Sequence, residues 1–168
     1  MGLSFGIPLM LIAAVLQSVW LEDTRILGGR PDLVLLLAVT WAIIQGANAG
    51  ATWGFVGGIF CDLLSGGSFG MWTLTLTTVG FIAGHPWVQA LGPTVIRLAL
   101  MSALGTLIGH ALLLALMALL GYPVDVGRAV QTVAGPAALL NLLLSPFVFT
   151  VLVWIHRRTQ QQSGGITL

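Results

Sequence analysis

The segment "GGIFCDLLSGGSFGMW", residues Gly57–Trp72, places an aspartate at the end of an apolar run and follows it with Ser-Gly-Gly. A carboxylate that faced lipid without a partner would be costly even near a helix end. At 100° per residue, Asp62 continues one helical stripe of small residues, which is made up of Ala47, Ala51, Gly54, Gly58 and Ser65. Such faces let helix backbones approach closely, so we expect this face to meet other helices rather than lipid.

The composition of the whole chain indicates a membrane protein. Of its 168 residues, 57% are hydrophobic and 7% are charged, and there is no lysine. Soluble domains carry about 25% charged residues, so a water-soluble enzyme is excluded. Six arginines without a basic stripe also exclude a nucleic-acid-binding protein. The single cysteine, Cys61, cannot form an intramolecular disulfide.

The apolar stretches predict one all-α transmembrane domain, a polytopic bundle of six transmembrane helices over residues 1–168. The expected spans are 4–21, 31–45, 47–64, 69–84, 95–120 and 132–155, with a polar tail at 156–168. Pro31 and Asp32 suit the opening of the second span, because proline and an acidic residue are both favourable at a helix start. That span is short, since fifteen residues cover about 22 Å of a hydrocarbon layer that is roughly 30 Å thick.

An even number of spans places both termini on the same side of the membrane. The arginines divide equally between the two sides, and Arg157 and Arg158 next to the last span favour cytoplasmic termini. The first span lacks the basic region of a secretory signal, so we expect it to be retained. The tryptophans predict two interfacial belts, one with Trp41, Trp53, Trp87 and Trp154 and the other with Trp20 and Trp72.

The spacing of small residues recurs in two later spans. The fourth span carries Thr73, Thr77, Gly80 and Gly84, and the fifth carries Gly105 and Gly109. We therefore expect the third, fourth and fifth spans to pack tightly. A sharp turn that contains Ser65, Gly66, Gly67 and Gly70 would join the third span to the fourth. Because the turn is tight, we expect Gly66→Val to crowd it.

Two roles for Asp62 follow from this setting. In the structural role the carboxylate holds the turn, accepting hydrogen bonds from the Gly66–Gly67 amides or from the hydroxyls of Ser65 or Ser68, or pairing with an arginine. In the functional role it relays a proton or cation, and His110 is the partner that the sequence offers at membrane depth. We favour the structural role.

Other polar residues in the spans do not form a recognised catalytic or metal-binding pattern. Cys61, Asp62 and His110 lack metal-ligand spacing, so neither a metal nor a cofactor is expected. An intramembrane serine protease would need a placed base and the G-x-S-G stretch of rhomboid-like proteases, which the chain lacks. We expect His110 and Asn141 to bond to neighbouring helices, and Arg97 to reach the interface or form an ion pair.

Two stretches together resemble the rod shape-determining protein MreD family. They are "RPDLVLLLAVTWAIIQG" and "GATWGFVGGIFCDLLSGGSFGMWTLTLTTVGFIAG", and they lie within Arg30–Gly84. The most specific element is the turn formed by Asp62, Ser65 and Gly66, with Gly70 beyond it; Pro31 and Asp32 add support.

The resemblance implies a non-enzymatic scaffold of the bacterial cell-elongation complex in the cytoplasmic membrane. Such a subunit would bind the single-span protein MreC and help organise the RodA glycosyltransferase and a class B penicillin-binding transpeptidase for peptidoglycan synthesis and cell shape. The actin-like MreB would lie on the cytoplasmic side.

A second interpretation comes from the similarity of this family to the substrate-binding subunits of vitamin transporters of the energy-coupling-factor type. These are also small six-helix membrane proteins. A ligand site would need a pocket with convergent polar groups. The polar candidates in the short outer loops are Glu22, Asp23, Arg25 and Asp125.

Overall fold

The computed structural model describes residues 3–19 and 28–163, with side chains described for 6–19 and 28–154. Within these residues the fold is all-helical and contains no β-strand. The elements are α1 (Leu3–Val19), α2 (Leu33–Gln45), α3 (Ala47–Ser65), α4 (Met71–Ala83), α5 (Pro86–Gln89), α6 (Thr94–Leu119), α7 (Val126–Ala129), the π-helical η1 (Val130–Ala134) and α8 (Gly135–Ser163).

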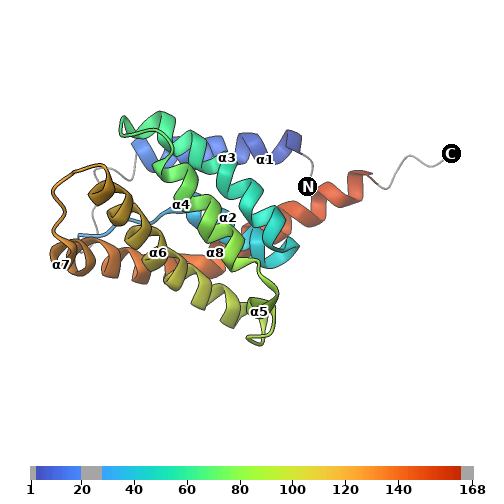
Figure 1. Cartoon of the computed structure of the whole chain (residues 1–168). Coiled ribbons are helices and arrows are strands. Elements are labelled where there is room, and N and C mark those ends of the chain that lie inside the picture. The colour runs from blue at the N-terminus through green and yellow to red at the C-terminus, as the bar shows by residue number, and fades with distance from the viewer. Residues whose placement is uncertain (1–2, 20–27, 164–168) are drawn as a thin grey trace.

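Helix α2 is the centre of the bundle. Ten of its residues are buried, on every side of the helix. It packs against α1, α3, α4, α6 and α8, and Figure 1 shows these helices around it. A helix that is enclosed in this way must be apolar all round, which accounts for the near-continuous run "LVLLLAV".

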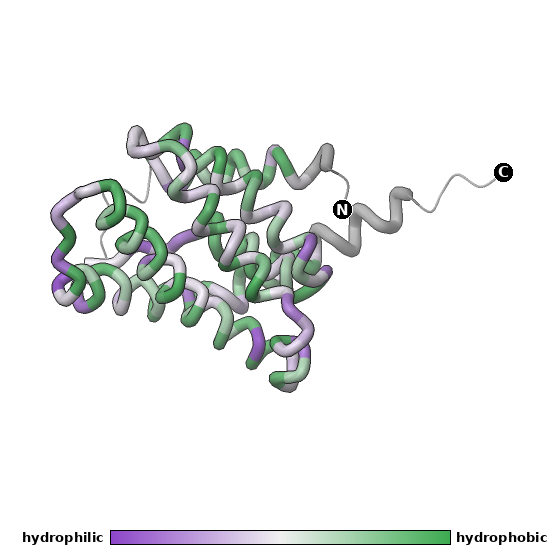
Figure 2. The backbone as a smooth tube through the Cα atoms, in the orientation of Figure 1, coloured by the Kyte–Doolittle hydropathy of each residue, from purple (hydrophilic) through white to green (hydrophobic). Residues whose placement is uncertain are grey.

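The bundle has two ends, which we name by their landmarks. The Asp62 end comprises the C-terminus of α1, the N-terminus of α2, the α3–α4 turn and the α6–α7 loop. The α5 end comprises the α2–α3 link, α5 and the start of α6. The Ser68 and Tyr122 hydroxyls, 3.5 Å apart, connect the two loops of the Asp62 end. Figure 2 shows that hydrophilic residues lie mainly at helix ends and connections.

The chain reverses between α2 and α3 through one residue, Gly46. Its φ of 93° and ψ of −179° belong to a backbone region that is essentially restricted to glycine. The Gly46 N–H donates to the Ala42 carbonyl at 2.8 Å, and its carbonyl accepts from the Gly50 N–H at 3.0 Å. One glycine therefore ends the first helix and begins the second, and it brings them side by side.

Prolines shape the last helical segment. Pro136 cannot donate to the Thr132 carbonyl, and the preceding turn is the π-helical η1. Pro146 likewise leaves the Leu142 carbonyl without its usual helical donor. The Ser145 hydroxyl donates to that carbonyl at 2.8 Å, which keeps it satisfied inside an apolar helix.

Two of the described helices are long and apolar enough to cross a membrane by themselves, Thr94–Leu119 and Val126–Trp154. Three further apolar helices are shorter: Gly6–Val19, Leu33–Gln45 and Met71–Ala83. Each predicted span overlaps one of the helices α1, α2, α3, α4, α6 and α8. The start of α1 and the end of α8 lie toward the same side of the bundle (Figure 1). The prediction of six spans itself stays a prediction.

The predicted tryptophan belts are wrong for two residues. Trp41 and Trp53 are buried, and their ring centroids lie 5.4 Å apart. Trp53 also fills the space that Gly6 leaves open on α1. These two rings belong to the hydrophobic core, because α2 and α3 bury them against each other. Trp87 and Trp154 of the same predicted belt are exposed. Trp20 lies outside the described residues.

Candidate functional site

Asp62 is the hydrogen-bonding centre of the α3–α4 turn. Its Oδ2 accepts from the backbone N–H of Gly70 at 2.9 Å and of Thr73 at 3.0 Å, and from the Thr73 hydroxyl at 2.6 Å. Its Oδ1 accepts from the Trp72 N–H at 2.9 Å. The carboxylate therefore caps the first turn of α4 from a neighbouring helix, because Gly70, the residue at the N-cap position, has no side chain to do so.

The geometry of the turn brings these groups together. Gly66 ends α3 in the left-handed conformation at φ 64°, and Gly70 starts α4 at φ 98°, so glycine is favoured at both positions. The hydroxyl of Ser65, the last residue of α3, donates to the Asp62 carbonyl at 3.2 Å and accepts from the Gly67 N–H at 3.4 Å. A Cβ at Gly66 would meet nothing within 4 Å. Substitution there strains the backbone, and the crowding expected from sequence is wrong.

The partners of Asp62 differ from those expected. The sequence suggested the Gly66–Gly67 amides, the hydroxyls of Ser65 or Ser68, or an arginine. In the structure the side chain instead contacts three residues of the α4 N-terminus, and no arginine pairs with it among the described residues. Asp62 is only 4% exposed. Its negative charge is compensated by amide donors and by the positive end of the α4 dipole.

Small residues bring the backbones of α3 and α4 into direct contact. A Cβ added at Gly54 would overlap the Leu76 carbonyl, and one at Gly58 would overlap the Thr73 backbone. Gly80 meets the backbone of Gly50, which the sequence stripe did not include. The remaining predicted contacts are on the same surface: Gly84 lies against Ala47, and Ala51 lies beside the Gly50–Gly80 contact. This contact surface continues from the α5 end to the turn that Asp62 holds.

Two of the predicted packing residues lie elsewhere in the same core. Gly105 of α6 faces the side chains of Val79 and Val39, and Gly109 faces Thr75 and Leu35. Helix α6 therefore packs against α4 and α2 through side chains rather than through backbone contact. The sequence predicted that the third, fourth and fifth spans would all pack tightly. In the structure only α3 and α4 of these make backbone contact, and α6 packs against α4 through side chains. Thr77 bonds within α4, to the Thr73 carbonyl at 2.6 Å.

A second buried polar cluster joins α2, α6 and α8. Of its contacts, the sequence predicts only that Asn141 bonds across helices. Asn141, fully buried, accepts from the Asp32 N–H at 2.8 Å and donates to the Thr106 hydroxyl at 2.8 Å. The expectation that Asn141 bonds across helices is therefore confirmed. The Thr106 hydroxyl donates in turn to the Ser102 carbonyl at 2.6 Å. Three helices distant in sequence are thus fixed to one another by amide and hydroxyl groups.

Asp32 is the α2 member of this cluster and caps its own helix. Its Oδ1 accepts from the Leu35 N–H at 2.9 Å, and Pro31 beside it is also buried. The side chain of Gln17 from α1 hydrogen-bonds to Asp32, and its Oε1 accepts from the Val34 N–H at 3.2 Å. The opening of α2 is therefore held by α1 and α8 together.

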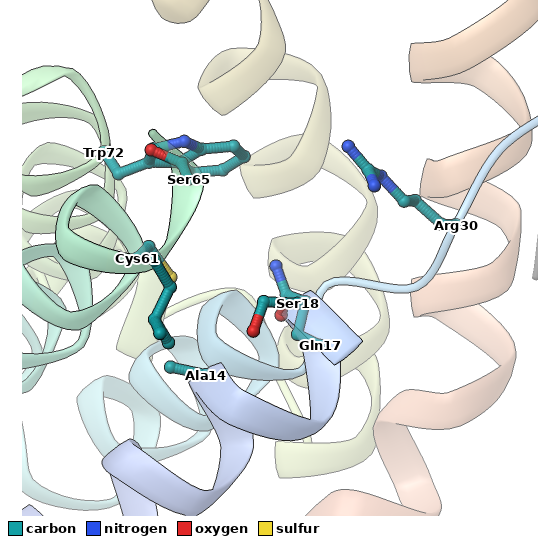
Figure 3. Close-up of a pocket in the computed structure, with 8 residues that line it drawn as sticks. Ala14, Gln17, Ser18, Arg30, Cys61, Ser65 and Trp72 are labelled. Atoms are coloured by element: carbon teal, nitrogen blue, oxygen red, sulfur yellow. The ribbon is translucent and has the colours of Figure 1, made fainter. Parts of the chain in front are cut away.

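A cavity of about 200 Å³ opens between these two polar centres. Figure 3 shows Gln17 and Ser18 of α1 on one side, Ser65 and Trp72 around the α3–α4 turn on another, and Arg30 across the opening, with Cys61 below the turn. Its lining mixes a cation, hydroxyls, an amide and an aromatic ring. The cavity lies at the Asp62 end of the bundle and offers both polar and apolar groups to a molecule that enters it.

The remaining candidates from sequence that the structure describes do not assemble into a reaction centre. His110 bonds through Nδ1 to the Thr106 carbonyl of its own helix at 2.8 Å, so the expected bond to a neighbouring helix is wrong. Among the described residues, no group of three or more His, Cys, Asp or Glu side chains could hold a metal ion. Glu22, Asp23 and Arg25 lie outside the described residues, and Asp125 is exposed and caps α7.

These features define a helical membrane protein whose buried polar groups join helices to one another. The family model of the rod shape-determining protein MreD matches residues 2–158, nearly the entire chain. The chain therefore belongs to the MreD family, which acts in the determination of rod shape, and the resemblance stated from sequence is confirmed. No curated protein and no solved structure matches it.

Proposed function

We propose that the chain is a non-enzymatic scaffold subunit of the bacterial cell-elongation complex. The observation that carries the proposal is the match of the MreD family model over residues 2–158. The buried polar groups support a structural role, because Asp62 and Asn141 each use their hydrogen-bonding capacity on neighbouring helices. A rigid helical platform is what a partner subunit needs to dock on.

In this proposal the chain crosses the bacterial inner membrane six times, with both termini in the cytoplasm. Helix α6, with 26 residues, is about 39 Å long and can cross the hydrocarbon layer alone. Helix α2, with 13 residues, is only about 20 Å long. Its neighbours enclose it, and Pro31 and Asp32 at its start are buried in protein, so this end of the short helix can lie at membrane depth.

The proposed partner is MreC, and through MreC the RodA glycosyltransferase and the class B penicillin-binding transpeptidase of peptidoglycan synthesis, with MreB on the cytoplasmic side. Binding would be helix on helix. In this account Asp62, Ser65, Gly66, Gly67 and Gly70 fix the turn, while the small residues of α3 and α4 keep the platform rigid. Pro31 and Asp32 fix the start of α2.

The alternative is a substrate-binding subunit of a vitamin-type energy-coupling-factor transporter. The observation that favours it is the cavity with Arg30, Gln17 and Ser65 in its lining. Its volume of about 200 Å³ is below the roughly 300–1,000 Å³ of ordinary ligand pockets. The family match over residues 2–158 is what makes the scaffold the better supported of the two functions.

Complementation of cell shape tests the scaffold. A rod-shaped host depleted of its own MreD and supplied with this chain together with its cognate MreC is expected to keep its rod shape. Asp62→Leu is expected to give round cells, and Asp125→Asn, which removes an exposed carboxylate, is expected to give rods. Membrane levels of each variant are measured by immunoblot. Round cells with the wild-type chain at normal membrane levels would contradict the proposal.

A further inference from the structure

The α5 end of the bundle contains a cation, Arg97, that has no acidic partner among the described residues. Arg97 lies in the first turn of α6. Its Nη1 donates to the Gln89 side-chain oxygen and its Nη2 to the Thr94 hydroxyl at 2.8 Å, whereas its Nε has no partner. Both partners are neutral. The positive end of the helix dipole lies at the same turn, so the guanidinium is in a position where a cation is unfavourable unless an anion accompanies it.

Within residues 28–154, no acidic side chain lies at this end. The sequence has five acidic residues. Asp32, Asp62 and Asp125 are at the Asp62 end, and the other two, Glu22 and Asp23, precede α2 and lie outside the described residues. Among the described residues the ion pair is that of Arg128 with Asp125, also at the Asp62 end. No described residue therefore supplies the counter-charge of Arg97, and an anion from outside the chain can supply it.

The neighbouring residues indicate the depth at which this anion lies. Helix α5 carries Trp87, which is 50% exposed, and Leu91 beyond it is also exposed. Exposed tryptophans of membrane proteins gather at the level of the lipid head groups. Gln89 of the same helix holds Arg97 and also donates to the Ile43 carbonyl at 3.3 Å. The guanidinium is thus fixed beside an aromatic interfacial anchor.

We propose that Arg97 binds the phosphate group of an anionic phospholipid in the leaflet at the α5 end. A guanidinium recognises phosphate with directed, charge-assisted hydrogen bonds. The first turn of α6 adds to this, because Pro93 at its N-cap offers no side-chain acceptor. The Ile96 and Arg97 amides donate to the Pro93 carbonyl, which leaves the Thr94 and Val95 amides for an anion. Gln89 and Thr94 orient the guanidinium. The inference depends on the membrane placement and is independent of MreC binding.

Native mass spectrometry with defined lipids tests this site. The purified chain is titrated with phosphatidylglycerol or phosphatidylcholine, and bound lipid is counted for the wild type, Arg97→Gln and the matched control Arg128→Gln. We expect the wild type to prefer phosphatidylglycerol, and Arg97→Gln to lower that preference about fivefold, the factor for one basic residue near a lipid surface. Arg128→Gln removes the same charge at the opposite end and should leave the preference unchanged.

Two further measurements separate the role of the charge from that of neutral hydrogen bonding, and lipid phosphate from free phosphate. Arg97→Lys keeps the charge and is expected to retain the preference within about twofold, since lysine also binds phosphate. Equal loss in Arg97→Lys and Arg97→Gln would overturn the proposal, because a neutral hydrogen-bonding role would then explain both. Inorganic phosphate is titrated in parallel. If it binds at Arg97 while phosphatidylglycerol does not, the lipid source is wrong. Thermal unfolding of each variant in phosphatidylcholine checks the fold.

Discussion

Replacing Asp62 tests whether hydrogen bonding by a buried carboxylate holds the α3–α4 turn. The wild-type side chain accepts four hydrogen bonds at 2.6–3.0 Å from Gly70, Trp72 and Thr73. Hydrogen bonds to charged groups contribute about 1.5–3 kcal/mol each, and those of one carboxylate do not add independently. Asp62→Leu removes every acceptor and leaves the start of α4 uncapped, for which we expect a loss of about 5 kcal/mol.

Asp62→Asn separates hydrogen bonding from charge. The asparagine oxygen can take the place of Oδ2 and keep three of the four contacts, while its NH₂ group faces the Trp72 N–H. We expect a loss of about 2–3 kcal/mol, roughly half that of the leucine variant. At about 2–4 °C per kcal/mol for a chain of this size, the unfolding temperature falls by roughly 5–10 °C for asparagine and 10–20 °C for leucine.

The assay is thermal unfolding of the purified protein in one detergent, followed by tryptophan fluorescence. Asp125→Asn is the control, because Asp125 also caps a helix, accepting from the Arg128 N–H at 3.0 Å, but is exposed. It should lose at most about 1 kcal/mol. Wild-type stability of Asp62→Leu would refute the capping argument. Equal and complete loss of function in both Asp62 variants, with normal folding, would show that the charge itself acts.

Three further changes test the packing and the second polar cluster. Asn141→Leu leaves the buried Asp32 N–H without its acceptor and removes one of the two partners of the Thr106 hydroxyl. It should lower stability by about 1–3 kcal/mol in the same thermal assay, and an unchanged unfolding temperature would argue against the cluster. Gly54→Ala should lower the stability by about 1–3 kcal/mol, because the added methyl group overpacks the contact with α4. Gly67→Ala is the control and should be nearly neutral, because its Cβ would meet only the Ser65 hydroxyl at 3.7 Å. Equal effects of the two substitutions would contradict the backbone contact of α3 with α4. Gly66→Ala should lower the stability by about 1–2 kcal/mol through backbone strain. Gly66→Asn should lower it less, because asparagine tolerates the left-handed conformation. A lower unfolding temperature for Gly66→Asn than for Gly66→Ala would count against this explanation.

The sequence predicted the helices well because apolar runs and glycine breaks are local signals. The third predicted span, 47–64, corresponds to α3 at Ala47–Ser65, and the small-residue stripe identified the face that meets α4. The same local signals could not reveal the partners of Asp62. Those lie eight to eleven residues further on, and they come within reach only because the chain turns at Gly66 and Gly70.

Contacts that depend on the arrangement of distant helices could be predicted only in part. Asn141 was expected to bond across helices, but its bond to the Asp32 N–H joins residues 109 positions apart, and no periodicity encodes that pairing. Trp41 and Trp53 were assigned to an interface because they lie near span ends. Their burial follows from α2 being enclosed, which depends on the packing of α1, α6 and α8 around it.

Native mass spectrometry of the protein, purified gently from its own membranes, tests the central claim most directly. We expect a co-purifying single-span protein of the MreC type and no bound small molecule of vitamin size. A stoichiometric vitamin-sized ligand, or a transporter coupling subunit in place of MreC, would contradict the scaffold and support the substrate-binding alternative.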